Sequence, residues 1–392
     1  MKIDPYHNKE NFTEWKAENQ KGISELSKAN SELILKYLND MEKGINVAIC
    51  STKGSRSYSR LVSLRNRLFF FSNKFKELYS LDDITKINEE QLISFFSGMR
   101  NGEIKRMDGK EYIGTADYIK VFKAFWHWHQ KTKRKQGIEI QDITIDLDTS
   151  RDKPKWVYLT EKQVKQMCEN AKYDYKVLMM FLFDTGIRAP TELMNVKVSD
   201  LYNECKELNI REETSKTFGR RIKLLLCRDM IKEFILVKKL SKEDYLFKIS
   251  PPIANQYIKR LALKLFGNEE SEAGGKYSQI SLYDFRHISC CYWLPRYKSE
   301  SALKYRFGWK KSDKIHYYSE LLGMKDTISE EDLLIDVTKT EIEKRLAQAE
   351  KDKEIMGERM AELEEQLKGM KELVMVVDGK VKIFEAQNAR QR

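Results

Sequence analysis

Apolar residues recur along this chain with different periods, and the changes of period divide it into segments. Between about residues 31 and 136, apolar side chains return every three or four positions, as they do on one face of a helix. Ser31, Asn88 and Thr115 stand where helix N-caps are expected, and glycine-containing connectors separate the stretches. The pattern predicts a helical bundle over residues 28–145, preceded by a loose polar extension over residues 1–27.

The helical pattern then breaks, and a segment with mixed periods follows. Apolar and polar residues alternate in the stretch IEIQDITIDLDTSRDKPKW, which also contains Pro154. We therefore interpret residues 146–156 as an extended linker. The region from residue 157 to 335 has both patterns. Helices are predicted for LTEKQVKQMCENA, with Thr160 as its N-cap, and for YKVLMMFLFDTG. Apolar and polar residues alternate in KELNIREETSKTFGRRIKLLL, as they do in a β-hairpin. The expected fold class is mainly α with a small β-hairpin sheet (α+β).

The last segment, residues 336–392, has a heptad pattern. Apolar residues from Ile342 to Phe384 alternate in steps of three and four, and Lys353 is the only polar residue among them. This spacing is typical of a coiled coil, and a single amphipathic helix folded back on the body is the alternative. Glycines inside the seam each cost about 1 kcal/mol of helix propensity.

The net charge, the cysteine spacing and the absence of long apolar runs limit the classes of protein to which this chain can belong. The formal net charge of +11 favours contact with nucleic acid or another acidic surface, although a merely basic protein remains the alternative. The six cysteines form no CxxC pair, which argues against a zinc site or a disulfide framework. The polar N-terminus and the lack of any run of ~18 apolar residues predict a cytoplasmic protein without a membrane span.

Candidate chemistry lies in separated segments of the region after the linker. Arg188 follows an apolar helix in TGIRAPTEL, and Lys216 lies in the predicted hairpin. SLYDFRHISCCYWL carries Arg286 and His287. Trp309, Tyr317 and Tyr318 lie in FGWKKSDKIHYYSELLG. Each residue alone has an ordinary structural explanation, and only their combination in this order points to a function.

That combination is suited to cleaving a phosphodiester without a metal ion. Arginine makes bidentate bonds to phosphate oxygens and stays charged, so two arginines can neutralise the transition state. A tyrosine hydroxyl can attack the phosphorus and form a covalent intermediate. A lysine can protonate the leaving oxygen. We therefore expect no metal, no other cofactor and no small-molecule substrate.

The same residues resemble the catalytic domain of the tyrosine recombinase (phage integrase) family, especially its archaeal and archaeal-virus members. Arg188 with the Glu192-Leu193 pair, and Arg286 in YDFRH, match the family's two catalytic arginines. The remaining matches are the hairpin lysine Lys216, the Gly308-Trp309 step whose ring donates to phosphate, and the nucleophile Tyr318. Tyr283 stands where the family has a histidine, three residues before Arg286.

Three departures from the family pattern bear on the site. Tyr283 could donate a hydrogen bond but is a poor proton-transfer group, and His287, the residue after Arg286, is the candidate to replace it. Arg188 and Glu192 are one residue further apart than usual, which Pro190 could accommodate by starting the next helix. Tyr317 adjoins Tyr318, so spacing alone selects the nucleophile.

The resemblance implies DNA strand exchange through a 3′-phosphotyrosine, for integration or excision of a mobile element. The partners implied are double-stranded DNA and other copies of the chain, as a free dimer or a tetramer on DNA. The helical block resembles the family's core-binding domain, whose phosphate contacts would come from Lys53, Arg56, Arg60, Arg65 and Arg67. The alternatives are a non-catalytic DNA-binding protein on the same fold and a type IB topoisomerase-like or resolvase enzyme.

Overall fold

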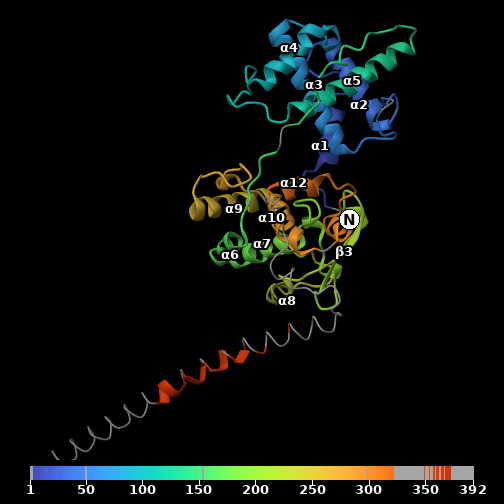
Figure 1. Cartoon of the computed structure of the whole chain (residues 1–392). Helices are drawn as coiled ribbons and strands as arrows, with labels where there is room; N and C mark the ends of the chain where they lie inside the picture. Colours follow the sequence, from blue (N-terminus) through green and yellow to red (C-terminus); the bar gives the residue numbers. More distant parts are fainter. Residues whose placement is uncertain are drawn as a thin grey trace, which may run out of the picture. The chain divides into compact units, whose positions relative to one another are not determined.

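The computed structural model describes residues 3–48, 51–151, 154–297 and 299–321, together with scattered positions between 348 and 371. The chain divides into two compact units, residues 1–323 and 324–392. The first unit contains two separate hydrophobic cores, one built from residues up to Leu147 and one that begins at Trp156. Figure 1 shows the helices that surround each core.

The first core belongs to an all-helical bundle, as the sequence predicts. Its helices are α1 (Asn8–Glu18), α2 (Lys28–Lys43), α3 (Tyr58–Tyr79), α4 (Glu89–Arg100) and α5 (Thr115–Arg134), with a short 3-10 turn η1 (Ile84–Lys86). Aromatic side chains fill this core, and Phe71, Phe75, Phe95 and Phe122 are completely buried. Many of their rings meet edge to face, the arrangement that the ring quadrupole favours.

Two details of the bundle differ from the prediction. Residues 8–18 form a helix with Phe12 completely buried, where a loose polar extension was expected. Asn88 caps α4 as predicted, but Ser27 caps α2 in place of Ser31, and Gly114 precedes α5 at the position expected of Thr115. The Ser31 hydroxyl is buried and accepts a hydrogen bond from the backbone N–H of Ile23 at 2.7 Å, so it serves the core.

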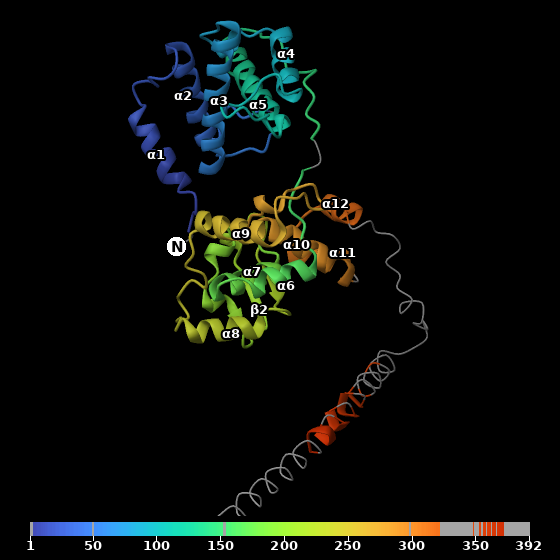
Figure 2. The ribbon, with the colours of Figure 1, turned by 90° about the vertical axis from the view of Figure 1, so that its left-hand side faces the viewer.

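The second core combines helices with one small sheet. The helices are α6 (Glu161–Glu169), α7 (Tyr173–Thr185), α8 (Arg228–Val237), α9 (Pro251–Phe266), α10 (Asp284–Trp293), α11 (Glu300–Phe307) and α12 (Asp313–Leu321). The apolar helix α7 packs against α6, α8 and α10 (Figure 2). Thr160 caps α6 through a reciprocal capping box with Gln163, as its position before the apolar run predicts.

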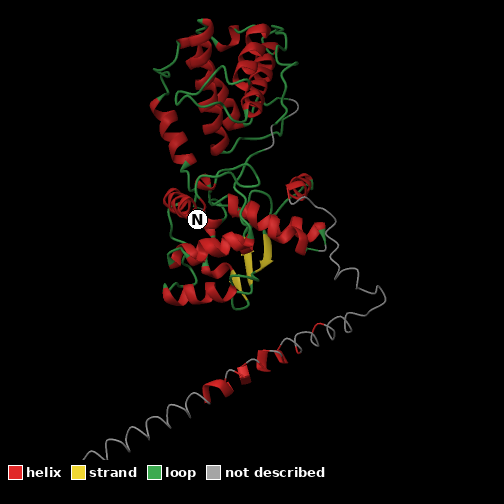
Figure 3. Cartoon of the chain, turned by 60° about the vertical axis from the view of Figure 1, so that its left-hand side comes forward, coloured by secondary structure: helices red, strands yellow, loops and turns green. Residues whose placement is uncertain are grey.

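The sheet is antiparallel, with the order β1 (Leu201–Tyr202), β2 (Glu207–Ile210) and β3 (Arg220–Lys223), drawn as arrows in Figure 3. Leu208 pairs with Ile222, and Ile210 pairs with Arg220. The loop between β2 and β3 includes the 3-10 turn η4 (Glu212–Thr214). The expected β-hairpin is therefore present, and its long loop carries Lys216.

The predicted coiled-coil segment falls mostly outside the described residues. The positions that are described between 348 and 371 are helical. Their apolar side chains are exposed, namely Met356, Met360, Leu363, Leu367 and Met370. In the part of the chain that the structure describes, no helix is long and apolar enough to cross a membrane.

Candidate functional site

A turn at the end of α11 is the point where the candidate residues meet. Phe307, Gly308 and Trp309 form it, and Gly308 has a φ of 60°, in the left-handed region. A Cβ on Gly308 would lie 2.9 Å from Arg220 Nη1, so only glycine lets the turn approach that side chain. Carbonyl oxygens of this turn accept hydrogen bonds from both candidate arginines.

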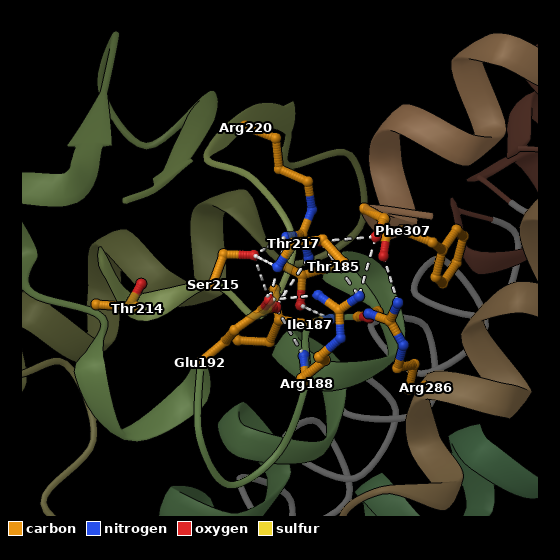
Figure 4. A network of polar contacts seen from close by, with 12 residues as sticks. Thr185, Ile187, Arg188, Glu192, Thr214, Ser215, Thr217, Arg220, Arg286 and Phe307 are labelled. Atoms are coloured by element: carbon orange, nitrogen blue, oxygen red, sulfur yellow. Dashed lines mark hydrogen bonds and ion pairs between the residues drawn. The ribbon is translucent and has the colours of Figure 1, made fainter. Parts of the chain in front are cut away.

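Arg188 is held from two sides (Figure 4). Its Nη1 donates to Glu192 Oε1 at 2.6 Å, and its Nη2 donates to the Gly308 carbonyl at 2.9 Å. The residue follows α7 after a left-handed turn at Gly186, where a Cβ would lie 2.2 Å from the Phe307 ring. Pro190 lies in a turn before the short 3-10 helix η2 (Leu193–Asn195), so it does not begin an α-helix as the sequence suggested.

Glu192 is the carboxylate that pairs with two arginines, Arg188 and Arg220, and we call these residues and their hydrogen-bond partners the cluster. Its side chain is completely buried between Arg188 and Arg220, whose Nη2 donates to Glu192 Oε2 at 2.8 Å. Burial alone would raise the pKa of Glu192, but the hydrogen bond and charge of Arg220 and the charge of Arg188 lower it to about 2. Glu192 is therefore ionised at neutral pH and compensates part of the positive charge of the site.

Lys216 is exposed, and both of its chain neighbours are fixed to the cluster. The Ser215 hydroxyl donates to Glu192 Oε1 at 3.1 Å, and the Thr217 hydroxyl donates to the Gly308 carbonyl at 2.8 Å. Figure 4 shows the contact of Ser215 with Glu192. The loop is thus anchored on each side of Lys216.

Arg286 lies on α10 and is buried beside Arg188. Its Nη1 donates to the Gly186 carbonyl at 2.5 Å, and its Nη2 donates to the Phe307 carbonyl. Burial, followed by the charge of Arg188, lowers the pKa of Arg286 to about 10, so the side chain still carries its charge at neutral pH. A guanidinium has five N–H donors, and these two hydrogen bonds leave others for a phosphate.

The two adjacent tyrosines on α12 have different surroundings. The Tyr318 ring is buried and stacks on Trp309 with centroids 5.8 Å apart, and its hydroxyl makes a hydrogen bond with His287 Nδ1. Burial raises the pKa of Tyr318, and the adjacent thiols of Cys290 and Cys291 act in the same direction, against Arg286. Tyr317 instead accepts from Trp156 Nε1 at 2.5 Å and donates to the Pro154 carbonyl at 2.8 Å.

Tyr283 and His287 are one helical turn apart at the start of α10. Tyr283 is 46% exposed, and its ring meets the His287 ring edge-on at 5.2 Å. His287 also packs on Trp156, with ring centroids 4.8 Å apart. The structure therefore brings His287, and not Tyr283, to the hydroxyl of Tyr318.

Sequence reasoning missed Arg220, Ser215 and Thr217 as parts of the cluster. A signal for Arg220 was present, because β3 alternates and Arg220 shares its inward face with Ile222. A charged residue on the inward face of a strand indicates a buried ion pair. The contacts of Ser215 and Thr217 depend on tertiary structure and leave no comparable signal. Among the described residues, no cluster of His, Cys, Asp and Glu could hold a metal ion.

Comparison with known proteins gives one family and several structures. Residues 157–323 match the model of the phage integrase family. The chain is similar to the Tn1549 transposon integrase in complex with transposon right end DNA, with 14% identity and a TM-score of 0.54 over 74% of this chain and 93% of that one. No curated protein sequence matches the chain.

Two further solved structures have the same fold. The XerH site-specific recombinase bound to palindromic difH substrate matches with 13% identity and a TM-score of 0.51, over 67% of this chain and 77% of that one. The lambda integrase dimer bound to a COC′ core site matches with 13% identity and a TM-score of 0.51, over 81% and 82%. At such identities the likeness establishes the fold alone.

The pKa of Glu192 predicts how stability depends on pH. Because the folded-state value of about 2 is below the ordinary 4.5, the stabilisation is complete above pH 4.5 and is lost as pH falls toward 2. We expect Glu192→Gln to lower the free energy of unfolding at pH 7 by about 3 kcal/mol. The difference from wild type should shrink below pH 4.5 in urea titrations.

The control for this experiment is Glu213→Gln, which removes an exposed carboxylate paired with Arg211. It should change the free energy of unfolding by less than about 1 kcal/mol. A Glu192→Gln deficit that stays constant between pH 7 and pH 3 would show that ionisation of Glu192 does not stabilise the fold.

Proposed function

Because residues 157–323 match the phage integrase family, we propose that this chain is a site-specific DNA recombinase. It cleaves and rejoins DNA strands through a 3′-phosphotyrosine intermediate. The observation that carries the proposal is the convergence of Arg188, Arg286, the loop of Lys216 and Tyr318 on the Phe307–Trp309 turn. Four segments that are far apart in the sequence supply these groups, and together they meet the needs of metal-free phosphoryl transfer.

The two arginines bind the scissile phosphate. Their guanidinium groups are fixed by backbone carbonyls and by Glu192 before any DNA arrives, and each keeps N–H donors for the non-bridging oxygens. Donors that are already oriented need no reorganisation when charge develops in the transition state, which makes them effective. The half-buried Trp309 lies between Arg286 and Tyr318, where its indole N–H can add a further donor.

Tyr318 is the nucleophile, and His287 accepts its proton. The raised pKa of the buried Tyr318 leaves its hydroxyl protonated at neutral pH, so an attack on phosphorus requires a base in contact with it. The hydrogen bond between His287 Nδ1 and the Tyr318 hydroxyl supports His287 as this base, which accepts the proton when Nδ1 is unprotonated. Tyr283 lies at the exposed margin and supports the His287 ring.

Lys216 donates a proton to the leaving 5′ oxygen. When the tyrosine oxygen bonds to phosphorus, the bond from phosphorus to that 5′ oxygen breaks, and the proton makes it a hydroxyl. Attack by a 5′ hydroxyl on the phosphotyrosine reverses these steps and joins the strands. The tyrosine ester conserves the energy of the broken bond, so the cycle consumes no ATP.

Other copies of the chain, and double-stranded DNA, are the partners of this reaction. The exposed Met360, Leu363 and Leu367 repeat at heptad spacing on the helical tail, and such a face is buried by a second identical helix. We place the protein among the archaeal or archaeal-virus integrases on the Leu-Leu-Gly stretch at residues 321–323. It acts in the cytoplasm on the DNA of a mobile element, as a dimer that assembles into a tetramer on two sites.

The nucleophile can be tested with a covalent-complex assay. Tyr318→Phe should abolish the covalent protein–DNA product on a nicked suicide duplex, because the attacking oxygen is gone, and should leave DNA binding intact. Tyr317→Phe is the matched control and should keep the product. The assignment is wrong if the two variants behave the other way round.

A sulfur-substituted substrate tests Lys216. Lys216→Ala should slow cleavage of ordinary DNA by at least ~100-fold, on the scale of general acid catalysis. It should cleave a 5′-bridging phosphorothiolate nearly as fast as wild type, because sulfur leaves without a proton. Equal defects on both substrates would assign Lys216 to phosphate binding instead.

Truncation tests the tail. Removing the residues after Thr340 should weaken multimer formation in analytical ultracentrifugation and in band shifts with two-site DNA. Single-site cleavage, measured as covalent product, should change less than the assembly does. A truncated protein that assembles normally but cleaves poorly would indicate that the tail packs on the catalytic domain.

A further inference from the structure

The hydroxyl groups of Ser215 and Thr217 carry out no step of the proposed reaction, yet both belong to the cluster. They stand on either side of Lys216 in the loop between β2 and β3. The Lys216 side chain is exposed, and none of the hydrogen bonds and ion pairs among the described residues involves its ammonium group. The position of that ammonium therefore depends on how the two neighbouring residues hold the backbone of the loop.

Each of the two hydroxyls shares its acceptor atom with Arg188. The Ser215 hydroxyl donates to Glu192 Oε1 at 3.1 Å, the same oxygen to which Arg188 Nη1 donates at 2.6 Å. The Thr217 hydroxyl donates to the Gly308 carbonyl oxygen at 2.8 Å, the same oxygen to which Arg188 Nη2 donates at 2.9 Å. Both sides of the loop are thus held by atoms that also hold the guanidinium group.

The hydrogen bonds form a closed ring that starts and ends at Arg188 and passes through Lys216. The Thr217 N–H donates to Ser215 Oγ at 3.4 Å, so the two anchors are also joined to each other across the lysine. One anchor would leave the loop free to turn about it. Two anchors on successive sides of Lys216 fix both the place and the direction of its backbone relative to the arginine.

Further contacts restrain the loop beyond the two hydroxyls. Arg220 Nη1 donates to Ser215 Oγ at 3.4 Å, and Arg220 is itself held by its buried ion pair with Glu192. On the other side of the lysine, the Phe218 ring lies against the Tyr305 ring of α11, with centroids 6.1 Å apart. The loop therefore has few alternative conformations that keep these contacts.

A restrained loop matters for a proton donor on a long side chain. A general acid is effective only when it lies within hydrogen-bond reach of the atom that it protonates. Lysine has a flexible stem, so a loose backbone would add many arrangements in which the ammonium misses that atom. Holding the backbone in place before the substrate arrives removes part of this search, as it does for other preoriented donors.

We propose that Ser215 and Thr217 are positioning residues that hold Lys216 at the phosphate bound by Arg188. In this role neither hydroxyl contacts DNA, and each acts through the backbone of the loop. The inference rests on the proposed recombinase function and deepens it. It gives two residues that the sequence alone did not single out the task of aligning the proton donor with the phosphate.

The test is single-turnover cleavage at saturating DNA by variants of the full chain, on ordinary DNA and on a 5′-bridging phosphorothiolate. Ser215→Ala and Thr217→Val should each slow cleavage of ordinary DNA about tenfold, the scale of one lost hydrogen bond. Both should cleave the sulfur substrate nearly as fast as wild type, because a misplaced acid is harmless when sulfur leaves without a proton. Thr217→Ser keeps the hydroxyl and should restore most of the rate on ordinary DNA.

Thr214→Val is the matched control in the same loop. The Thr214 hydroxyl donates to the Arg211 carbonyl at 2.9 Å, and Figure 4 shows Thr214 apart from the cluster. This variant also loses a hydroxyl to an isosteric side chain, but it should cleave both substrates like wild type. Urea titrations identify any variant that fails to fold. If either Ser215→Ala or Thr217→Val does so, the other carries the test by itself.

Combining Thr217→Val with Lys216→Ala separates this inference from the proposed function. If the hydroxyl acts through Lys216, the second change should add little to the loss caused by Lys216→Ala on ordinary DNA. That result is expected even if Lys216 binds phosphate and donates no proton, and both single variants would then be equally defective on the two substrates.

The contrary outcomes are equally distinct. Losses that multiply in the double variant would overturn the inference, because the hydroxyl would then act through Arg188 or through stability alone. So would a Thr217→Val defect that persists on the sulfur substrate while the Lys216→Ala defect disappears there. A wild-type chain that forms no covalent product would overturn the proposed function and this inference together.

Discussion

The ion pairs of the buried Glu192 carboxylate are the interaction on which the candidate site depends. Three elements meet at its two oxygens: the turn that carries Arg188, the strand β3 through Arg220, and the hairpin loop through Ser215. Removing this carboxylate from water is costly unless its hydrogen-bonding capacity is filled, and here the partners fill it. The same contacts therefore define the distance between Arg188 and the loop that carries Lys216.

A second buried carboxylate fixes the other end of the hairpin. Asp184, at the end of α7, accepts backbone hydrogen bonds from Leu225, Leu226 and Cys227 and pairs with the buried Arg306 of α11 at 2.8 Å. The end of α7 thus holds the segment that follows β3, and it holds α11 as well. Because α11 leads directly into the Phe307–Trp309 turn, both carboxylates position that turn.

The site concentrates positive charge, and the protein neutralises only part of it. Arg188, Arg220 and Arg286 surround Glu192, and the charge of Arg188 contributes to the lowered pKa of Arg286. Backbone carbonyls of Gly186, Phe307 and Gly308 partly solvate the guanidinium groups without cancelling their charge. Folding therefore leaves like-charge repulsion in the site, and bound negative charge would relieve it.

Local patterns in the sequence determined most of the secondary structure and the candidate residues. Asn88 and Thr160 cap helices because their side chains reach backbone donors only a few residues away, and the β2–β3 hairpin follows from alternation. Arg188, Arg286 and Tyr318 could be proposed from the order of their motifs. Only the tertiary structure decided which groups surround them. Arg220 pairs with Glu192, and His287 rather than Tyr283 makes a hydrogen bond with Tyr318. Such contacts join segments that are distant in sequence, so they depend on how the whole core packs.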